Sequence, residues 1–260
     1  MRTNMAGVGR YKLIRRLHEA EGYEAYSALD IEVSTRPQVL LNIYFGPDAV
    51  RQMVPMFYGM DSEVCPDFVR VYTEDGRFTA VFALHEGEPF EDVFPQRGGS
   101  LSAEERETFA ESLLHGALEC ASMPARLLSA VLQPENVAVQ RKNNRVCINC
   151  ILPPVAGEEK AQGGGVPGAL SPMLERVLRR PWRATDEQID FLDRAADGGY
   201  ASVSALYSAW RELLPKMEED RKRGRLLEML IRFLRRSFRR WRKRRKEERA
   251  RKKRLREEAL

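Results

Sequence analysis

Local patterns divide this 260-residue chain into a β-rich first third and a largely helical remainder. Runs of β-branched and aromatic residues occur at 11–17 (YKLIRRL), 24–30 (EAYSALD) and 38–45 (QVLLNIYF). A longer run at 68–84 contains two strand-like stretches around the turn EDG, which is a good hairpin signal. Strands that come before the helices, rather than alternating with them, predict an α+β fold.

Helical periodicity begins at 101–121 (LSAEERETFAESLLHGALECA). Ser102 and Glu105 have the spacing of a capping box, so a helix should begin directly after Ser102. Apolar residues then recur at helical spacing through this segment, which predicts one buried face: Phe109, Leu113, Leu114, Ala117, Leu118 and Ala121.

The remaining elements follow from shorter signals. Two apolar runs, VAVQ and RVCINCIL, flank the turn RKNN and predict a hairpin. Closely spaced Gly and Pro residues predict a flexible loop over 153–171. Further helices are expected within 47–60 and over 171–180, 185–196 and 202–217.

The charge of the chain is unevenly distributed. Residues 221–260 contain 20 Lys/Arg and five Asp/Glu, a net charge of +15, whereas the whole chain carries +5. The first 220 residues therefore carry a net charge of −10. This division predicts a mildly acidic folded domain over 1–217 and a strongly basic segment over 218–260.

Targeting signals and cysteine spacing indicate in which cellular compartment the protein is expected. The N-terminal sequence lacks the apolar stretch of a secretory signal, and no window approaches the roughly 18 apolar residues of a membrane span. We therefore expect a cytoplasmic protein with reduced thiols. Cys147 and Cys150 have a metal-like spacing, but no second pair or nearby His completes a site. Structural cysteines and no metal are thus expected.

The stretch LQPENVAV, followed by RVCINCIL, resembles the catalytic loop of protein kinases and the strand that leads to their DFG motif. Other segments resemble this family in its own order. YKLIRRLHEAEGYEAYSALD is similar to the first two strands, VLLNIY to the strand with the nucleotide-binding lysine, and CPDFVRVY to the entry of the next strand. FTAVFALHEGEPFEDVF resembles the hinge region, and RAADGGYASVSALYSAWREL the last two helices. Over residues 11 to about 215 the resemblance implies a reduced two-lobed fold, with a β-rich N-lobe and a truncated helical C-lobe.

The resemblance also locates the family's nucleotide-binding positions in this sequence. The glycine-rich loop positions fall at His18, Ala20 and Tyr23, whose side chains limit close approach of phosphates. The position of the nucleotide-binding lysine falls at Asn42, which supplies no cation. Nucleotide binding of the usual kind is therefore not expected.

The catalytic positions are changed as well. The HRD motif becomes Ser-Ala-Val, so Val131 stands where the catalytic base would be, and Gln133 replaces the lysine two residues later. The DFG aspartate falls at Cys150, or at Asn149 if the alignment shifts by one residue. Only Asn136 keeps the identity of a metal ligand, and we expect it to shape the loop by hydrogen-bonding the backbone. The resemblance thus implies a pseudokinase with no catalytic residue, no cofactor and no small-molecule substrate.

Residues 226–242 are strongly amphipathic. At about 100° per residue, a helix through this segment has one apolar face and one arginine face. The apolar face comprises Leu226, Leu227, Leu230, Ile231, Phe233, Leu234, Phe238 and Trp241, and the basic face includes Arg232, Arg235, Arg236, Arg239 and Arg242.

Three partners suit such a helix. An anionic membrane surface matches both faces, because the apolar side chains enter the interface and the arginines meet the headgroups. Packing of the apolar face on the folded domain, on a partner helix or on a second copy of the chain ranks equally with the membrane surface. Nucleic acid ranks third, because binding phosphates does not require an apolar face.

Our principal hypothesis is therefore a non-enzymatic scaffold that binds a protein through its kinase-like domain and lies on the inner membrane face through its tail. The layout resembles that of bacterial type VII secretion pseudokinase subunits, in which a kinase-like cytosolic domain precedes a membrane-spanning segment, although this sequence lacks such a span. Two alternatives remain. One is an atypical nucleotide-dependent transferase with a rearranged active site, and the other is an adaptor associated with nucleic acid.

Overall fold

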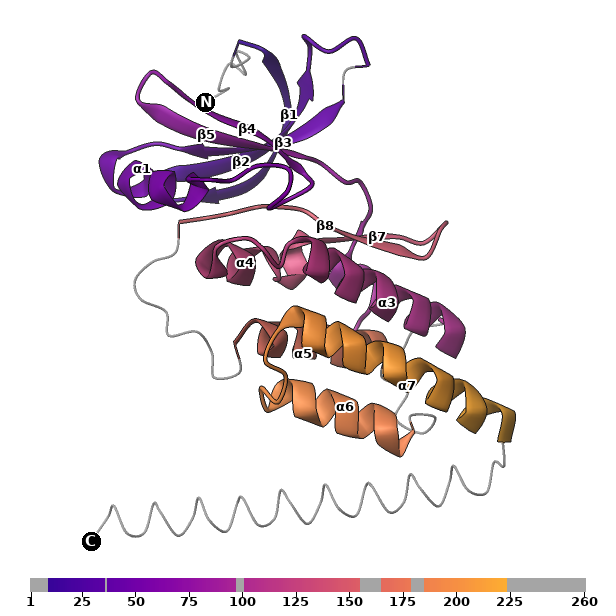
Figure 1. Ribbon diagram of the computed structural model, residues 1–260. Helices are drawn as coiled ribbons and strands as arrows, with labels where there is room; N and C mark the ends of the chain where they lie inside the picture. Colours follow the sequence, from indigo (N-terminus) through magenta and orange to yellow (C-terminus); the bar gives the residue numbers. More distant parts are fainter. Residues whose placement is uncertain (1–8, 36, 97–100, 155–164, 179–184, 224–260) are drawn as a thin grey trace, which may run out of the picture.

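The computed structural model describes residues 9–35, 37–96, 101–154, 165–178 and 185–223. These residues form a five-stranded sheet, a three-stranded sheet and a helical part below them (Figure 1). Strands predominate before residue 90 and helices after it, so the predicted α+β fold is confirmed.

The larger sheet has the strand order β1-β2-β3-β5-β4, and every neighbouring pair is antiparallel. A helix and a 3₁₀ turn follow β3 and lie against one face of this sheet (Figure 1). The elements are β1 (Tyr11–Ala20), β2 (Tyr23–Asp30), β3 (Gln38–Tyr44), α1 (Pro47–Met53), η1 (Val54–Phe57), β4 (Phe68–Glu74) and β5 (Arg77–Ala83).

The predicted EDG hairpin is confirmed between β4 and β5. Glu74 pairs with Arg77, which leaves Asp75 and Gly76 as the two turn residues, with φ angles of 49° and 72°. Positive φ at both positions is the requirement of a type I′ turn, whose twist matches the flanking strands and which Asp-Gly favours.

The smaller sheet has the order β6-β7-β8 and includes the predicted β7–β8 hairpin. The long helix α3 packs against β8, α5 and α7. The elements of this part are β6 (Glu88–Pro89), α2 (Phe90–Val93), α3 (Ala103–Glu119), α4 (Ala125–Val131), η2 (Pro134–Asn136), β7 (Val137–Gln140), β8 (Arg145–Ile148), α5 (Gly165–Leu178), α6 (Asp186–Ala196) and α7 (Val203–Arg223).

Helix α3 begins as the capping box predicts. The Ser102 hydroxyl accepts a hydrogen bond from the Glu105 backbone N–H at 3.1 Å, and the Glu105 carboxylate accepts one from the Ser102 backbone N–H at 2.6 Å. These reciprocal bonds satisfy two backbone donors at the helix start.

Helix α5 corrects the expected loop over 153–171. The helix begins at Gly165, so the last seven residues of that range are helical. Pro167 lies in the first turn, where its missing N–H costs no hydrogen bond. The apolar residues Leu170, Met173, Leu174 and Val177 are spaced at helical intervals and all are buried. Burial of this stripe outweighs the local preference of Gly and Pro for a loop.

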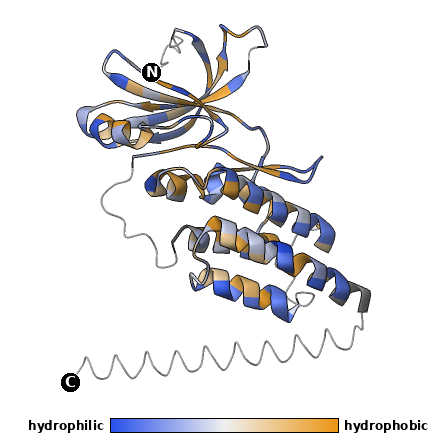
Figure 2. Ribbon diagram, in the orientation of Figure 1, coloured by the Kyte–Doolittle hydropathy of each residue, from blue (hydrophilic) through white to orange (hydrophobic). Residues whose placement is uncertain are grey.

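One hydrophobic cluster extends through both parts of the molecule. It contains Leu40 and Phe82 of the larger sheet, Val139 of the smaller sheet, Leu113 of α3 and Trp210 of α7. A second cluster, which includes Leu41 and Val81, is formed by the same strands of the larger sheet. Figure 2 shows the helices divided into apolar and polar faces, as packing in layers requires.

Helix α7 continues to Arg223, so the expected domain boundary at 217 lies within a helix. The predicted amphipathic segment from Leu226 to Arg242 lies outside the described residues. Among the helices that the structure describes, none combines the length and apolar composition needed to cross a bilayer.

Candidate functional site

The candidate site lies where residues Asn149–Leu152, which we call the crossing segment, pass between the larger sheet and helices α3 and α4 (Figure 1). This segment follows β8 directly. Its polar groups bind β2, β3, the linker after β5 and the loop that contains η2. Four of the eight kinase-site positions expected from the sequence therefore meet at this segment: Tyr23, Asn42, Asn136 and Cys150.

Asn42 connects the larger sheet to the crossing segment. Its side chain is 0% exposed and lies on β3, the central strand. Its Nδ2 donates to the Cys150 carbonyl at 2.9 Å, and its Oδ1 accepts from the Leu152 backbone N–H at 2.9 Å. The position expected for a nucleotide-binding lysine thus holds a neutral amide that is bonded to main chain.

Two tyrosines complete this contact. The Tyr23 hydroxyl donates to Asn42 Oδ1 at 2.6 Å and accepts from the Leu152 N–H at 3.0 Å, and the Tyr44 hydroxyl donates to the Leu152 carbonyl at 2.8 Å. Burial raises the pKa of both tyrosines, so both hydroxyls stay neutral. The larger sheet is therefore joined to the crossing segment by uncharged, buried hydrogen bonds.

Asn136 binds the crossing segment from the opposite side. Its Nδ2 donates to the carbonyls of Ala130 and Ile151, at 2.8 and 3.2 Å, and its Oδ1 accepts from the Ile151 N–H at 3.1 Å. Its backbone carbonyl accepts from the Asn149 N–H at 2.7 Å. The prediction that this side chain hydrogen-bonds the backbone is confirmed.

Asn149 binds the linker after β5, which joins the two parts of the molecule. Its Oδ1 accepts from the His85 backbone N–H at 2.9 Å, and its Nδ2 donates to the His85 carbonyl at 3.1 Å. One amide side chain thus pairs with a donor and an acceptor together, as an Asn side chain does with the N6 and N7 atoms of an adenine base. The backbone groups of the linker at His85 are therefore already satisfied from within the chain.

The strand positions expected for a glycine-rich loop form a tight hairpin instead. Ala20 pairs with Tyr23, which leaves Glu21 and Gly22 as the turn, and His18 lies on the exposed edge of β1. Gly22 has a φ of 68°, and a Cβ there would come within 2.8 Å of the Phe45 carbonyl oxygen. Glycine is thus required here by the turn and by close packing.

The positions expected for the catalytic loop also make contacts within the fold. Val131 is the last residue of α4, is 0% exposed and belongs to the main hydrophobic cluster. The Gln133 side chain donates to the Ser129 carbonyl at 2.8 Å. Cys150 is buried within the same cluster. Among the described residues, no group of three or more His, Cys, Asp or Glu side chains is arranged to hold a metal ion.

Sequence reasoning did not assign roles to several residues of this site. Tyr44 and His85 act through partners 64 or more residues away, and no local pattern marks such pairs. Asn149 was named only as an alternative DFG position, and its bonds to His85 were not foreseen. The Asp67 carboxylate lies 2.8 Å from His85 Nε2, and this hydrogen bond raises the pKa of His85 although burial opposes the shift.

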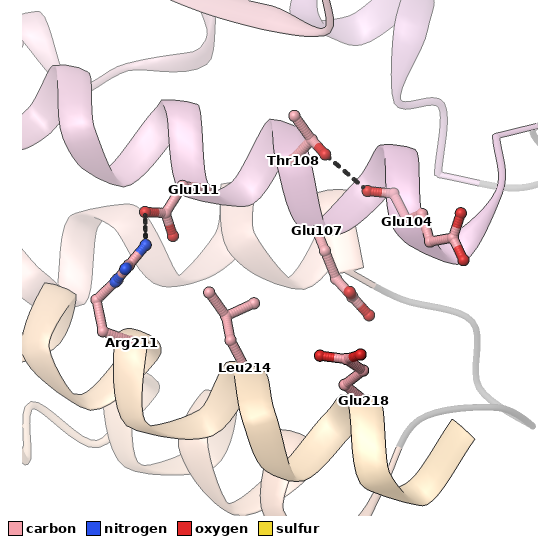
Figure 3. A pocket seen from close by; sticks show the side chains of 7 residues that line it. All are labelled: Glu104, Glu107, Thr108, Glu111, Arg211, Leu214 and Glu218. Carbon is pink, nitrogen blue, oxygen red and sulfur yellow. Dashed lines mark hydrogen bonds and ion pairs between the residues drawn. The ribbon is translucent and has the colours of Figure 1, made fainter. Parts of the chain in front are cut away.

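A second feature is a surface pocket of about 640 Å³ between α3 and α7. At one end, Glu111 accepts hydrogen bonds from Tyr207 and Arg211, at 2.8 and 3.0 Å, and from the Trp210 indole. At the other end, the carboxylates of Glu107 and Glu218 point toward one another (Figure 3). The pocket is lined by Glu104, Glu107, Thr108, Glu111, Arg211, Leu214 and Glu218, so its lining is acidic.

No protein-family profile and no curated protein matches this sequence. Solved structures do match. The PknI kinase domain of Mycobacterium tuberculosis superimposes with a TM-score of 0.56 and 12% sequence identity, over 81% of this chain and 98% of that domain. A variant of the same domain superimposes with a TM-score of 0.54 at 13% identity, over the same shares of the two chains. At such low identity these similarities describe the fold alone.

Proposed function

From the protein kinase-like fold of this chain, we propose that it is a catalytically inactive pseudokinase that acts as a protein-binding scaffold. In this proposal the folded domain binds a protein partner, and the basic segment after residue 218 holds the molecule at the inner membrane surface.

The main support for the proposed lack of catalysis is the set of residues at and around the crossing segment. Phosphoryl transfer requires a cation on the phosphates, metal ligands and a base or positioning residue for the nucleophile. The corresponding positions here are Asn42, Cys150 and Val131, which supply neither a positive charge nor a carboxylate. The polar atoms of Asn42 are hydrogen-bonded to the crossing segment.

Nucleotide binding at this place would cost stability. A ligand between β3 and the crossing segment has to separate Asn42, Tyr23 and Tyr44 from their partners at Cys150 and Leu152. Each buried polar group left without a partner costs about 1–3 kcal/mol. A ligand would have to replace several such bonds before it gained any affinity.

Thermal unfolding with Mg²⁺-ATP tests the inactivity. A ligand present at about 100 times its Kd stabilises the folded state by roughly 2.7 kcal/mol, which is readily measured as a shift in Tm. We expect no shift with ATP, Mg²⁺ or both. A Mg²⁺-dependent stabilisation that is lost in Asn136→Ala would overturn the proposal in favour of the nucleotide-dependent transferase.

The membrane role rests on the amphipathic pattern of residues 226–242 and is tested in the full chain. We expect the protein to pellet with vesicles that contain anionic lipid and not with neutral vesicles. The variant Arg235→Gln/Arg239→Gln/Arg242→Gln should lose this binding. A matched control, Lys252→Gln/Lys253→Gln/Arg254→Gln, removes the same charge beyond the apolar face and should retain most of it.

Two outcomes decide against membrane binding through the amphipathic segment 226–242. If both triple variants pelleted equally with anionic vesicles, net charge alone would explain the binding and the apolar face would have no role. Binding of duplex DNA or RNA by the wild type, with no binding to anionic vesicles, would favour the nucleic-acid adaptor.

For the scaffold role, cross-linking and mass spectrometry should identify a protein partner that contacts the folded domain.

A further inference from the structure

Strand β4 forms one edge of the larger sheet. Among the strands that the structure describes it pairs with β5 alone, so the backbone groups on its outer side have no partner strand. The register with β5 is regular from Arg70 to Glu74, and we call these five residues the edge segment. Val71 is 37% exposed, and Thr73 and Glu74 are exposed as well. The edge segment is thus open to solvent.

Two opposite charges lie on the same face of the edge segment. Side chains alternate along a strand, so Arg70, Tyr72 and Glu74 face one way while Val71 and Thr73 face the other. At about 3.4 Å per residue, Arg70 and Glu74 are separated by roughly 14 Å along the strand, which is too far for an ion pair. Neither side chain forms an ion pair with any residue that the structure describes. Within one chain the two charges therefore do not neutralise each other.

The surroundings of Arg70 position its guanidinium but supply no anion. The guanidinium carbon lies 5.4 Å from the centroid of the Tyr11 ring and 4.9 Å from that of Tyr72, so two cation–π contacts hold it. Its Nε is buried and has no hydrogen-bond partner among the described residues. Arg10 provides a comparison, because it lies 5.6 Å from the same Tyr11 ring but its Nε donates to the Asp30 carboxylate at 2.8 Å. Arg70 lacks the anion that Arg10 has.

The edge segment is complementary to a second copy of itself. If two copies pair antiparallel about a twofold axis at Tyr72, Arg70 of each copy lies opposite Glu74 of the other. Val71 then lies opposite Thr73, and the two Tyr72 rings are neighbours. Residues directly opposite in an antiparallel pair have Cβ atoms about 4.5–5.5 Å apart, and pairs of opposite charge, aromatic pairs and pairs of β-branched residues stabilise the sheet. All five cross-strand pairs are thus of stabilising kinds.

We propose that the protein forms a symmetric dimer in which the edge segments of two copies pair antiparallel and join the two larger sheets. Charge sets the register, because a shift of the twofold axis to Val71 or Thr73 separates Arg70 of one copy from Glu74 of the other. A charge that points over the sheet from an edge strand also discourages pairing with unrelated strands. A second copy places a carboxylate opposite this charge. The dimer goes beyond the proposed scaffold role and does not depend on it.

The contact between two edge segments is small, so the dimer should be weak. Five residues from each copy bury less than the roughly 1,600 Å² of a typical stable interface. We therefore expect a Kd between about 1 and about 100 μM. Because Arg70 and Glu74 meet near the surface, salt should screen their attraction and weaken the dimer further.

Sedimentation equilibrium of the full-length protein, from about 5 to about 500 μM, tests the proposal. The wild type should show a reversible equilibrium between monomer and dimer. Arg70→Glu and Glu74→Arg each place like charges opposite one another, so each variant should bind itself more weakly by about tenfold or more. In an equimolar mixture of the two variants, both of these cross-strand pairs again have opposite charges, so a heterodimer should form.

The control Arg126→Glu reverses an exposed charge on α4 and should leave dimerisation unchanged. Glu74→Arg alters an exposed side chain, so it decides the question even if Arg70→Glu fails to fold. A wild type that stays monomeric throughout the concentration range would overturn the proposal. So would a dimer that persists in Glu74→Arg, because its contact must lie elsewhere in the chain, or a mixture of the two folded variants that stays monomeric.

Discussion

The side-chain oxygen of Asn42 accepts a hydrogen bond from the backbone N–H of Leu152, 110 residues later in the chain. This bond joins the central strand of the larger sheet to the segment that runs beneath it. Asn42→Leu keeps the branched shape of the side chain but removes its hydrogen bonds to the Cys150 carbonyl, the Leu152 N–H and the Tyr23 hydroxyl. We expect a loss of about 3 kcal/mol in the free energy of unfolding, measured by urea denaturation.

The control for this variant is Asn143→Ala, since Asn143 is exposed in the turn between β7 and β8 and should change stability little. A double-mutant cycle with Tyr44→Phe, which removes the bond to the Leu152 carbonyl, should show that the two effects are not additive. Additive losses would mean that the two side chains do not act through one segment.

Glu111 should hold α7 against α3. Its carboxylate accepts hydrogen bonds from Tyr207, Trp210 and Arg211, three residues of α7. Because these bonds involve a charged acceptor, we expect Glu111→Ala to cost roughly 2 kcal/mol of stability and Glu111→Gln to cost less. Calorimetry provides the measurement, and Glu212→Ala, which removes an exposed carboxylate from α7, is the control. Equal Tm values for Glu111→Ala and the control would refute this role.

Arg106 should stabilise the end of α5. This side chain is 6% exposed, and its Nη1 donates to the carbonyls of Arg176 and Val177, at 3.3 and 2.8 Å. Carbonyls in the last turn of a helix lack partners within the helix and favour a cation. Arg106→Met should therefore cost about 3 kcal/mol, whereas Arg126→Met at an exposed site should cost little. Hydrogen exchange should show faster opening of α5 in the first variant alone.

The His85–Asp67 pair makes stability depend on pH. The hydrogen bond that the His85 ring makes to the Asp67 carboxylate raises the pKa of His85 in the folded protein above the value of 6.5 expected when it is unfolded. The folded state therefore binds the proton more tightly, and this stabilisation is fully present below pH 6.5 and is lost as the pH rises through the folded pKa.

His85→Gln measures this effect. The difference in unfolding free energy between the wild type and this variant should shrink as the pH rises from about 5.5 to about 8.5. A difference that stays constant or grows over this interval would show that the pair does not favour the protonated ring.

The parts of the fold that the sequence predicted well depend on neighbours in the chain. Asp75 and Gly76 specify their turn by their own backbone preferences, and Ser102 and Glu105 specify a helix start within four residues. The order of the elements, together with segments such as LQPENVAV that resemble protein kinases, suggested a kinase-like fold, which the structural similarity to PknI supports. The start of α5 was missed because burial of Leu170 and Leu174, a tertiary effect, overrides the local preferences of Gly and Pro.

The candidate site was predictable only in part, for the same physical reason. The sequence shows which residues stand at Asn42 and Asn136, and the backbone bonding of Asn136 was foreseen. The sequence does not show which contacts a residue makes when it replaces a catalytic or nucleotide-binding residue of the kinase family. The pairing of Asn149 with His85 and the bond from Asn42 to the Cys150 carbonyl join distant parts of the chain, and they exist only after the fold has formed.

The hydrogen bonds around the crossing segment also affect how this molecule would recognise another. Many enzymes close loops or domains around a substrate and open them to release the product, and this motion changes the shape of any surface that spans the moving parts. Here Asn42 and Asn136 hold the same short segment from opposite sides. A partner that spans both parts of the molecule would therefore meet a surface that these hydrogen bonds hold in one arrangement. Such preorganisation reduces the entropy lost on association, so a modest contact area could yield a long-lived complex.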